Sequence, residues 1–366
     1  MNHFSSTDYR HMAMAIREAA RGQYTTSPNP NVGCVLARDD EVVATGYHHC
    51  AGEGHAEVNA LAKVASAKGL TAYVTLEPCS HYGRTGPCAL ALIEAGVSRV
   101  VCAMQDPNPQ VAGRGIAMLR EAAVRVDVGL LEEEAKKLNP GFIKRMRSAL
   151  PHVTVKMAMS IDGRTAMRSG ESQWITGPQA RSDVQRLRAR SCAIVTGISS
   201  ILEDDSSLTV RETQLGLDNA ADVASRQPLR VVLDPANRLP EHAKILQQPG
   251  RTLRVVADSQ YADSEGVVSL PGADGRIDLE GLLHYLAERE QCNNVLIEAG
   301  ATLSGSIVSQ GLFDQLYLYV APTLLGSDAR PLFEMPLTQM AQQRRLRLIE
   351  QRAVGDDIRY IYCASE

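Results

Sequence analysis

Hydrophobic positions change their spacing repeatedly along the chain, as they do when helices alternate with strands. Near the N-terminus they recur at helical spacing behind a cap at Ser6 or Thr7, which predicts an amphipathic helix. Residues 31–48 contain two β-rich runs joined by a polar turn, which predicts a hairpin. From residue 57 to 150 helical and strand-like runs alternate, and this predicts a largely parallel sheet covered by helices. The expected helices are 57–69 and 89–96, and the expected strands are 71–78 and 98–107.

A second α/β region is predicted after an interruption at residues 139–151, where a proline, a glycine and a basic cluster stand together. We place the boundary there, with a first domain over 1–147 and a second over 152–366. The polar segment 212–227 is expected to be a surface loop. In the second domain the pattern predicts helices at 179–189, 279–289 and 301–311, and strands at 152–160, 191–197, 229–235, 252–258, 293–300 and 314–326.

Length and composition agree with two soluble domains that bind small molecules. The chain has 366 residues, which at about 150 residues per domain suggests roughly two. Hydrophobic residues make up 44% and charged residues 22%, the balance of a globular protein. A net charge of −4 offers no basic surface for a polyanion, and 4% aromatic residues argue against stacking on unpaired bases. We therefore expect small ligands and no nucleic acid.

Targeting signals and a disulfide framework are both absent from the pattern. No run approaches the 18 or so apolar residues that a membrane-spanning helix needs, and the N-terminal segment is charged throughout. Eight cysteines are scattered without regular spacing, which is typical of a reducing compartment. The sequence predicts a cytoplasmic protein without a membrane partner.

A histidine, a glutamate and two cysteines form the first chemical motif. His55 and Glu57 lie in GEGHAEVNA, and Cys79 and Cys88 lie in LEPCSHYGRTGPC. One imidazole and two thiolates leave the fourth tetrahedral position of a zinc ion to water, as in catalytic sites, and zinc lowers the pKa of that water toward about 7. A carboxylate such as Glu57 then has to move protons.

The H-x-E and P-C elements are the signature of zinc-dependent nucleobase deaminases. Here, however, the second cysteine follows nine positions after the first, so that spacing alone leaves open two unligated thiols. His55 and Glu57 can both face one metal only in the first turn of a helix. Cys79 follows a strand and Pro78, at a position where a second helix could begin, and a helix N-terminus favours a thiolate.

Several other polar residues near these motifs admit two interpretations. Asn29 and Asn31 stand among prolines and either form a rigid turn or bind the edge of a pyrimidine. Arg84 either meets a substrate phosphate or points into solvent. No role is assigned to His48, His49 and His81.

The second half lacks the glycine patterns of dinucleotide-binding and P-loop folds. A strand that ends in glycine and opens a helix, VLIEAG followed by ATLSGSIV, offers backbone N–H groups to a phosphate. Such turns are common in α/β proteins, so this feature alone is weak.

The chain closely resembles the bifunctional deaminase/reductase family of riboflavin biosynthesis. The first half matches the deaminase in PNPNVGCV, GYHHCAGEGHAE, VTLEPCSHYGRTGPC and MQDPNPQVAGRG. The second half matches the reductase in KMAMSIDGRTA, SGESQWIT, RLRAR, VTGISSILEDDSSLTVR and IEAGATLSGS. The resemblance implies a cytidine-deaminase-like three-layer domain followed by a dihydrofolate-reductase-like domain, and self-association as a dimer or larger through the second.

The resemblance also implies the two reactions. The first domain is expected to remove the 2-amino group of 2,5-diamino-6-ribosylamino-4(3H)-pyrimidinone 5′-phosphate as ammonia, with zinc-activated water attacking ring carbon C2. Zinc would be held by His55, Cys79 and Cys88, and Glu57 would carry protons. The second domain is expected to reduce the ribosyl group of the resulting aminouracil to a ribityl chain with NADPH.

Carried over position by position, the family implies two sets of residues in the second domain. Lys156 and Asp204 are our candidates for steering protons, and Trp174 lies either beside the nicotinamide or in the core. Arg188 and Arg211 suit a phosphate, and Glu298 suits ribose hydroxyls. The cofactor set is Ala158, Trp174, Ser200, Asp204, Gly300, Ala301, Thr302, Leu303, Ser304, Gly305 and Ser306, and the substrate set is Ser172, Arg188, Leu208, Arg211 and Glu298.

Two rival interpretations are less well supported. A deaminase of tRNA or free nucleosides with an unrelated appendage disagrees with the acidic balance and with the reductase-like second half. A zinc-stabilised nucleotide sensor would have no need of Glu57, because a structural zinc site requires no proton shuttle.

Overall fold

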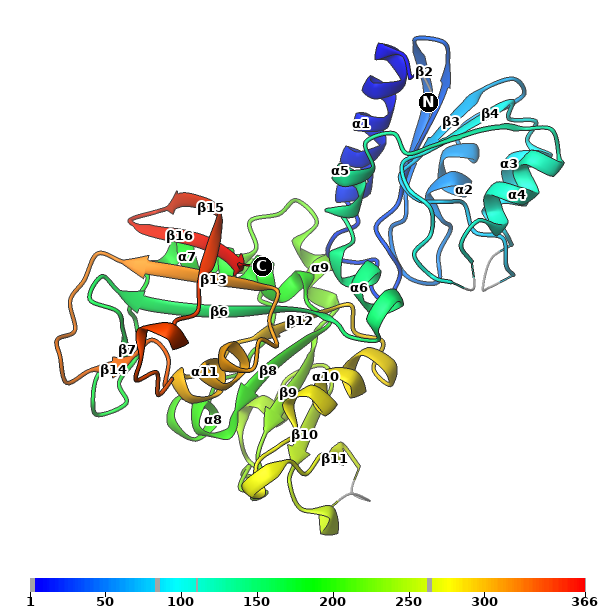
Figure 1. Ribbon diagram of the computed structural model, residues 1–366. Coiled ribbons are helices and arrows are strands. Elements are labelled where there is room, and N and C mark those ends of the chain that lie inside the picture. The colour runs from blue at the N-terminus through cyan, green and yellow to red at the C-terminus, as the bar shows by residue number, and fades with distance from the viewer. Residues whose placement is uncertain (1–3, 83–85, 110, 262–264, 366) are drawn as a thin grey trace. The chain divides into compact units, whose positions relative to one another are not determined.

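The computed structural model describes residues 4–82, 86–109, 111–261 and 265–365 (Figure 1). The chain divides into two compact units, residues 1–149 and 150–366, and each is described by itself. Among the described residues, no helix has both the length and the apolar character needed to cross a membrane.

The first unit is built on a five-stranded sheet in the order β2-β1-β3-β4-β5. β3, β4 and β5 run parallel, whereas β1 pairs antiparallel with both β2 and β3, so the expected hairpin and parallel sheet are both present. The strands are β1 (Gly33–Arg38), β2 (Glu41–Tyr47), β3 (Thr71–Val74), β4 (Arg99–Cys102) and β5 (Arg125–Val128). The helices are α1 (Ser6–Ala20), α2 (Ala56–Leu61), α3 (Cys88–Glu94), α4 (Arg114–Glu121), α5 (Glu132–Lys136) and α6 (Pro140–Ser148).

Helices cover both faces of this sheet, which makes the unit three layers deep (Figure 1). Along β1, Cys34 and Leu36 join a buried cluster with α2, α3 and α4. The alternate residues Val35 and Ala37 join a cluster with α1 and α5 on the opposite face. This alternation is the period of two that a strand imposes on its side chains. The cytidine-deaminase-like layering expected from the resemblance is therefore present.

Several boundaries in the first unit differ from the sequence prediction, and the strand expected at 98–107 ends at Cys102. The N-cap of α1 is Ser5, whose side chain accepts the N–H of Asp8 in a capping box. α2 ends at Leu61 rather than at residue 69, and β3 ends at Val74. Pro140 begins helix α6 instead of interrupting the structure, because the first helical turn needs no N–H from that position.

The second unit contains a nine-stranded sheet in the order β11-β10-β9-β8-β12-β6-β13-β16-β15. All of its pairings are parallel except those of β16 with β13 and β15. These strands are β6 (His152–Ser160), β8 (Ala193–Gly197), β9 (Leu229–Leu233), β10 (Thr252–Val256), β11 (Val267–Ser269), β12 (Asn294–Ile297), β13 (Gln315–Ala321), β15 (Leu346–Val354) and β16 (Asp357–Ala364). A separate two-stranded sheet pairs β7 (Arg164–Ala166) with β14 (Arg330–Pro331).

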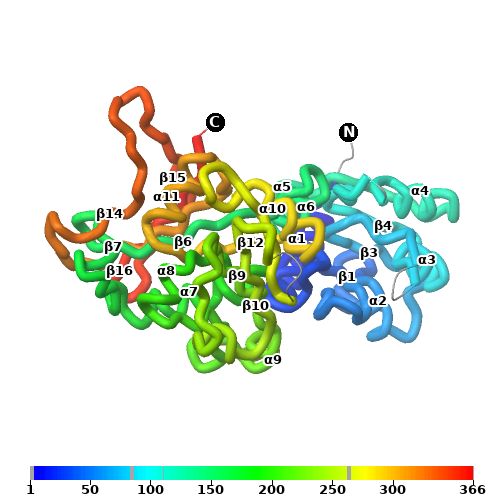
Figure 2. Tube along the Cα trace, turned by 90° about the horizontal axis from the view of Figure 1, so that it is seen from below, coloured from blue at the N-terminus to red at the C-terminus, as the bar shows by residue number. Residues whose placement is uncertain are grey.

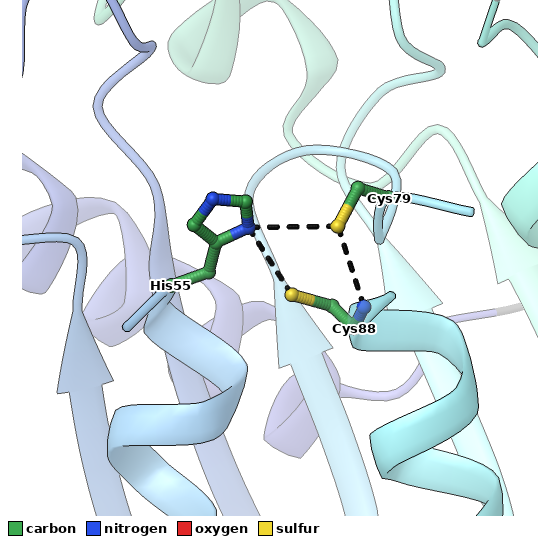
Figure 3. Close-up of side chains that lie close together, drawn as sticks. All are labelled: His55, Cys79 and Cys88. Atoms are coloured by element: carbon green, nitrogen blue, oxygen red, sulfur yellow. Dashed lines mark hydrogen bonds between the residues drawn. The ribbon is translucent and has the colours of Figure 1, made fainter. Parts of the chain in front are cut away.

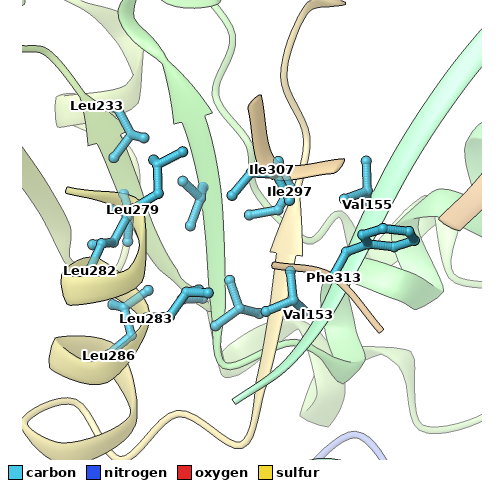
Figure 4. Close-up of a cluster of buried hydrophobic side chains, with 14 of the residues drawn as sticks. Val153, Val155, Leu233, Leu279, Leu282, Leu283, Leu286, Ile297, Ile307 and Phe313 are labelled. Carbon is cyan, nitrogen blue, oxygen red and sulfur yellow. The ribbon is translucent and has the colours of Figure 1, made fainter. Parts of the chain in front are cut away.

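Two buried clusters hold helices against the faces of the large sheet. One face packs against α10 (Leu279–Glu288) and α11 (Ala301–Ser309), and Figure 4 shows the leucines of α10 beside Leu233, Val153 and Ile297. The other face packs against α7 (Pro178–Arg190) and α8 (Ile198–Asp204). Because β6, β8, β9 and β12 are parallel, their carboxyl ends lie along one edge, where α/β folds usually bind ligands.

The second unit also departs from the prediction in several segments, and β7, α8, β11 and β14 were not predicted. The segment 212–227, expected to be a loop, contains α9 (Ala220–Ser225), and its Leu215 and Val223 are fully buried against the body of the unit. The prediction contained neither β15 nor β16, and the connection between β14 and β15 forms an extended loop (orange-red, Figure 2).

Acid should destabilise the first unit through Asp8. Burial raises the pKa of this carboxyl, but bonds from Arg99 (Nη1 to Oδ1, 2.7 Å), Ser5 and Tyr73 lower it well below its usual range. Because the folded pKa lies below the unfolded value of about 3.9, the ionised carboxylate stabilises the folded state. This stabilisation, on the order of 2–3 kcal/mol for such a carboxylate, is present above the unfolded pKa and is lost as pH falls toward the folded pKa. We expect Asp8→Asn to lower the melting temperature at pH 7 and to flatten its decline between pH 5 and 3 in calorimetry. An unchanged decline would contradict this assignment.

Candidate functional sites

Three metal-ligating side chains converge in the first unit. His55 is the N-cap of α2, Cys79 follows β3, and Cys88 is the first residue of α3 (Figure 3). The Nδ1 atom of His55 lies 3.2 Å from Cys88 Sγ and 3.5 Å from Cys79 Sγ, and all three ligand atoms lie within 4.8 Å of one another. Around a tetrahedral zinc the usual bond lengths separate a nitrogen and a sulfur by roughly 3.6 Å. The donor set and its spacing therefore fit zinc.

The local backbone explains why residues far apart in sequence meet. α2 lies so close to β2 that a Cβ on Gly46 would be 2.3 Å from the carbonyl oxygen of Ala56, so this position requires glycine. The helix expected at 89–96 is α3, which begins at Cys88, and no helix begins at Cys79. Even so, the N–H of Cys88 donates to Cys79 Sγ at 3.3 Å, which places that sulfur at the helix start. Bonds from Cys88 and then His55 lower the pKa of the Cys79 thiol.

Glu57 lies beside these ligands as a buried carboxyl. Glu57 is only 2% exposed, and its Oε2 atom has no hydrogen-bond partner among the described residues. Burial, and after it the charge of Cys79, raises the pKa of Glu57 to about 7. His55 and Glu57 share the first turn of α2, as the motif required. A carboxyl of this kind can both take and release a proton near neutral pH.

Glu77 supports the site and was not found from the sequence. This carboxylate is 3% exposed and precedes Pro78 and Cys79 in the chain. It fixes the loop that enters α4 by accepting the backbone N–H groups of Asp106, Gly113, Gly115 and Ile116. The only sequence signal was a glutamate next to Pro78 and Cys79, and a single glutamate forms no recognisable motif. In the same loop, burial raises the pKa of Asp106 to about 6.

The two asparagines near the prolines serve different purposes. Asn31 is held by the fold, because its Nδ2 donates to the Leu138 carbonyl and its own N–H donates to Asn139. Asn29 instead bonds His48, with Nδ2 and Nε2 3.0 Å apart. His48 Nδ1 faces the Gly54 carbonyl, so it must carry the proton, and Nε2 accepts from Asn29. This leaves the oxygen of Asn29 available to a ligand. Arg84 lies outside the described residues.

A cavity of about 560 Å³ opens at the carboxyl edge of the sheet in the second unit. It brings together eleven of the residues that the family implies and also Lys156. The lining includes Ala158, Ser172, Trp174, Arg188, Ser200, Asp204, Leu208, Arg211, Glu298, Gly300 and Ala301.

Five of the implied cofactor residues do not line this cavity, because they lie within α11 rather than in a turn. Thr302 bonds Glu334, Ser304 is fully buried, and a Cβ on Gly305 would be 2.6 Å from the Glu334 carbonyl oxygen. Leu303 and Ser306 are likewise absent from the lining.

Arg188 is already paired inside the cavity, which changes its expected role. Its Nε and Nη2 donate to the two carboxylate oxygens of Glu298 at 2.6 and 2.9 Å, and its Nη1 donates to the carbonyl of Thr209. Three of the five N–H donors of Arg188 are therefore engaged within the protein, whereas Arg211 is exposed and has no such contact within the described chain. Burial lowers the pKa of Lys156. The negative charge of Glu298 raises this pKa, and the positive charge of Arg188 lowers it.

Trp174 is 67% exposed, which excludes the interpretation as a core tryptophan. The guanidinium carbon of Arg181 lies 4.6 Å from the centre of its ring. Arg181 was not singled out from the sequence, where one arginine among many in a helix gives no signal.

Comparisons with known proteins show the family of the chain. The family "Cytidine and deoxycytidylate deaminase zinc-binding region" matches residues 5–104, and the family "RibD C-terminal domain" matches residues 151–360. The chain is 50% identical to riboflavin biosynthesis protein RibD of Escherichia coli over 96% of this chain and 98% of the relative. It is 47% identical to the protein of the same name from Haemophilus influenzae over 99% of each.

Solved structures give the same result. A structure of Acinetobacter baumannii RibD superposes with a TM-score of 0.91 at 47% identity, and covers 98% of this chain and 99% of that one. A deaminase/reductase from Thermotoga maritima superposes with a TM-score of 0.86 at 28% identity and the same coverage.

Proposed function

Because the chain belongs to the RibD family, the bifunctional deaminases and reductases of riboflavin biosynthesis, we propose how its own residues divide the two reactions. Residues 1–149 carry the deamination of 2,5-diamino-6-ribosylamino-4(3H)-pyrimidinone 5′-phosphate, and residues 150–366 carry the reduction of the ribosyl group. The observation that carries this assignment is the convergence of His55, Cys79 and Cys88 beside a buried, partly unpartnered Glu57.

In the deaminase, the three ligands orient the reaction and Glu57 moves protons. His55, Cys79 and Cys88 would hold a zinc ion, which when bound would supply Lewis-acid activation of water and lower the pKa of that water toward about 7. Glu57 accepts one proton of the attacking water and donates it to the ring nitrogen next to C2. It then takes the remaining proton of the hydroxyl group added to C2 and delivers it to the amino group, which leaves as ammonia while the C2 carbonyl forms. The Asn29 oxygen, oriented by His48, accepts a hydrogen bond from the pyrimidine.

Removing one ligand should remove the metal. We expect Cys88→Ala to lose its zinc on dialysis, since two remaining ligands hold the ion poorly, while the wild-type chain retains one equivalent. Cys50→Ala is the matched control, because Cys50 is a free cysteine of the same unit outside the ligand cluster. Atomic emission spectroscopy measures zinc per chain. Full zinc occupancy in Cys88→Ala would refute the ligand assignment.

In the reductase, we assign NADPH as the hydride donor and place its nicotinamide against Trp174. The N–H groups at the start of α11, at Gly300 and Ala301, suit its diphosphate. Glu298, which is fixed by Arg188, accepts hydrogen bonds from hydroxyl groups of the ribose, and the exposed Arg211 binds the substrate phosphate. Lys156 lies where it can donate a proton to the ring oxygen as the ribose opens, and its lowered pKa favours that donation.

A further inference from the structure

Trp174 has one covered face and stands at the wall of the reductase cavity. Arg181, in the first turns of α7, covers that face at 4.6 Å from the ring centre. The guanidinium is held in place because Nη1 donates to the carbonyl of Thr176 at 2.7 Å. The indole is nevertheless 67% exposed. A flat ligand can therefore stack on it opposite to a fixed positive charge.

The charge of Arg181 is not neutralised by contact. Within the described part of the chain no carboxylate pairs with it directly, and Asp357, which feels its charge, accepts the N–H of Gly177 instead. A cation over an indole is bound by the negative face of the ring. A second cation on the other face would be attracted by the same ring but repelled by the first cation.

We propose that Arg181, acting through Trp174, makes the reductase bind the uncharged reduced nicotinamide more tightly than the cationic oxidised ring. The inference rests on the proposed placement of NADPH against Trp174. An oxidised ring stacked on the open face would lie roughly 8 Å from the guanidinium. Coulomb repulsion at that distance, with an effective dielectric constant between that of water and that of a protein surface, weakens binding on the order of three- to tenfold. Arg181 thereby favours loading of NADPH and release of NADP⁺.

The test uses Trp174 itself, because it is the only tryptophan of the 366 residues. Its fluorescence in the full-length chain is titrated with NADPH and with NADP⁺, and calorimetry gives a second value of each Kd. The variants are Arg181→Gln, which keeps a flat polar group but removes the charge, and Arg181→Lys, which keeps the charge. We expect Arg181→Gln to reduce the ratio of the two Kd values about three- to tenfold. Arg181→Lys should retain most of it.

The outcomes separate this inference from the proposed cofactor site. If Arg181→Gln weakens both nucleotides equally, Arg181 only supports the loop, and the inference is wrong although the cofactor site stands. If neither nucleotide changes the fluorescence of the wild-type chain, the placement against Trp174 is wrong and the inference fails with it. The melting temperature of each variant in calorimetry reports whether the second unit, which contains Arg181 and Trp174, is folded.

Discussion

Glu57→Gln should reduce ammonia release by about 10²–10⁴-fold, the usual contribution of a positioned general acid/base. Glutamine has the size of glutamate but cannot accept a proton from water or return one to the ring and the leaving amine. It is not a ligand, so zinc content should remain at one equivalent. The fold should also tolerate the change, because Glu57 is buried without an ion-pair partner and a neutral amide avoids the cost of burying a charge.

The control for Glu57→Gln is the other reaction of the same chain. The variant should reduce aminouracil ribosyl phosphate at the wild-type rate when that intermediate is supplied. Assays of ammonia and of NADPH oxidation on one preparation measure both. Ammonia release within threefold of wild type, with zinc bound, would remove Glu57 from the mechanism.

Lys156→Met should have the converse effect, a loss of reduction by roughly 10²–10³-fold with deamination intact. Lys156 lines the reductase cavity, and burial lowers the pKa of its ammonium group although the negative charge of Glu298 acts in the opposite direction. A group of lowered pKa gives up its proton readily, as opening of the ribose ring requires. Methionine preserves the length and the packing of the side chain but donates no proton.

Binding and proton transfer by Lys156 can be separated in the kinetics. A proton donor affects kcat, whereas a residue that only attracts the substrate phosphate affects KM. Lys156→Arg keeps a positive charge that does not dissociate, and should be nearly as slow as Lys156→Met. Wild-type kcat in Lys156→Arg would show that charge alone matters and would assign the proton to another group.

Most helices and strands could be predicted because their hydrophobic pattern is visible in the sequence. The apolar face of α1 and the period of two in β1 follow from burial on defined faces. Central strands of the large sheet, such as β8 and β9, are buried on both faces and appear as continuous apolar runs. Boundaries were less accessible. Pro140 was interpreted as an interruption, yet a proline at the first helical position is compatible with a helix. The hairpin β15–β16 was missed, since most residues of β15 are exposed and leave little hydrophobic pattern.

The proposed zinc ligands could be predicted from motifs together with the family resemblance, whereas the residues that support them could not. The nine-residue spacing of Cys79 and Cys88 alone left two unligated thiols open, so the resemblance was needed to choose between the two interpretations. The hydrogen bonds that Glu77 accepts from the loop and first turn of α4 join residues 29 to 39 positions apart in sequence. The same holds for Arg188, which was expected to bind phosphate and instead pairs with Glu298, 110 positions away. No local pattern encodes such a pairing. The exposure of Trp174 likewise became visible only in the fold.

Mass spectrometry of the diaminopyrimidinone ribosyl phosphate after incubation with zinc-loaded chain and NADPH tests the central claim most directly. Two independent sites in one chain predict full conversion to the deaminated, reduced product by wild type. Lys156→Met should stop at the deaminated intermediate, and Glu57→Gln should leave the substrate with its amino group. Deamination by Glu57→Gln, or a failure of Lys156→Met to deaminate, would contradict the assignment of one reaction to each unit.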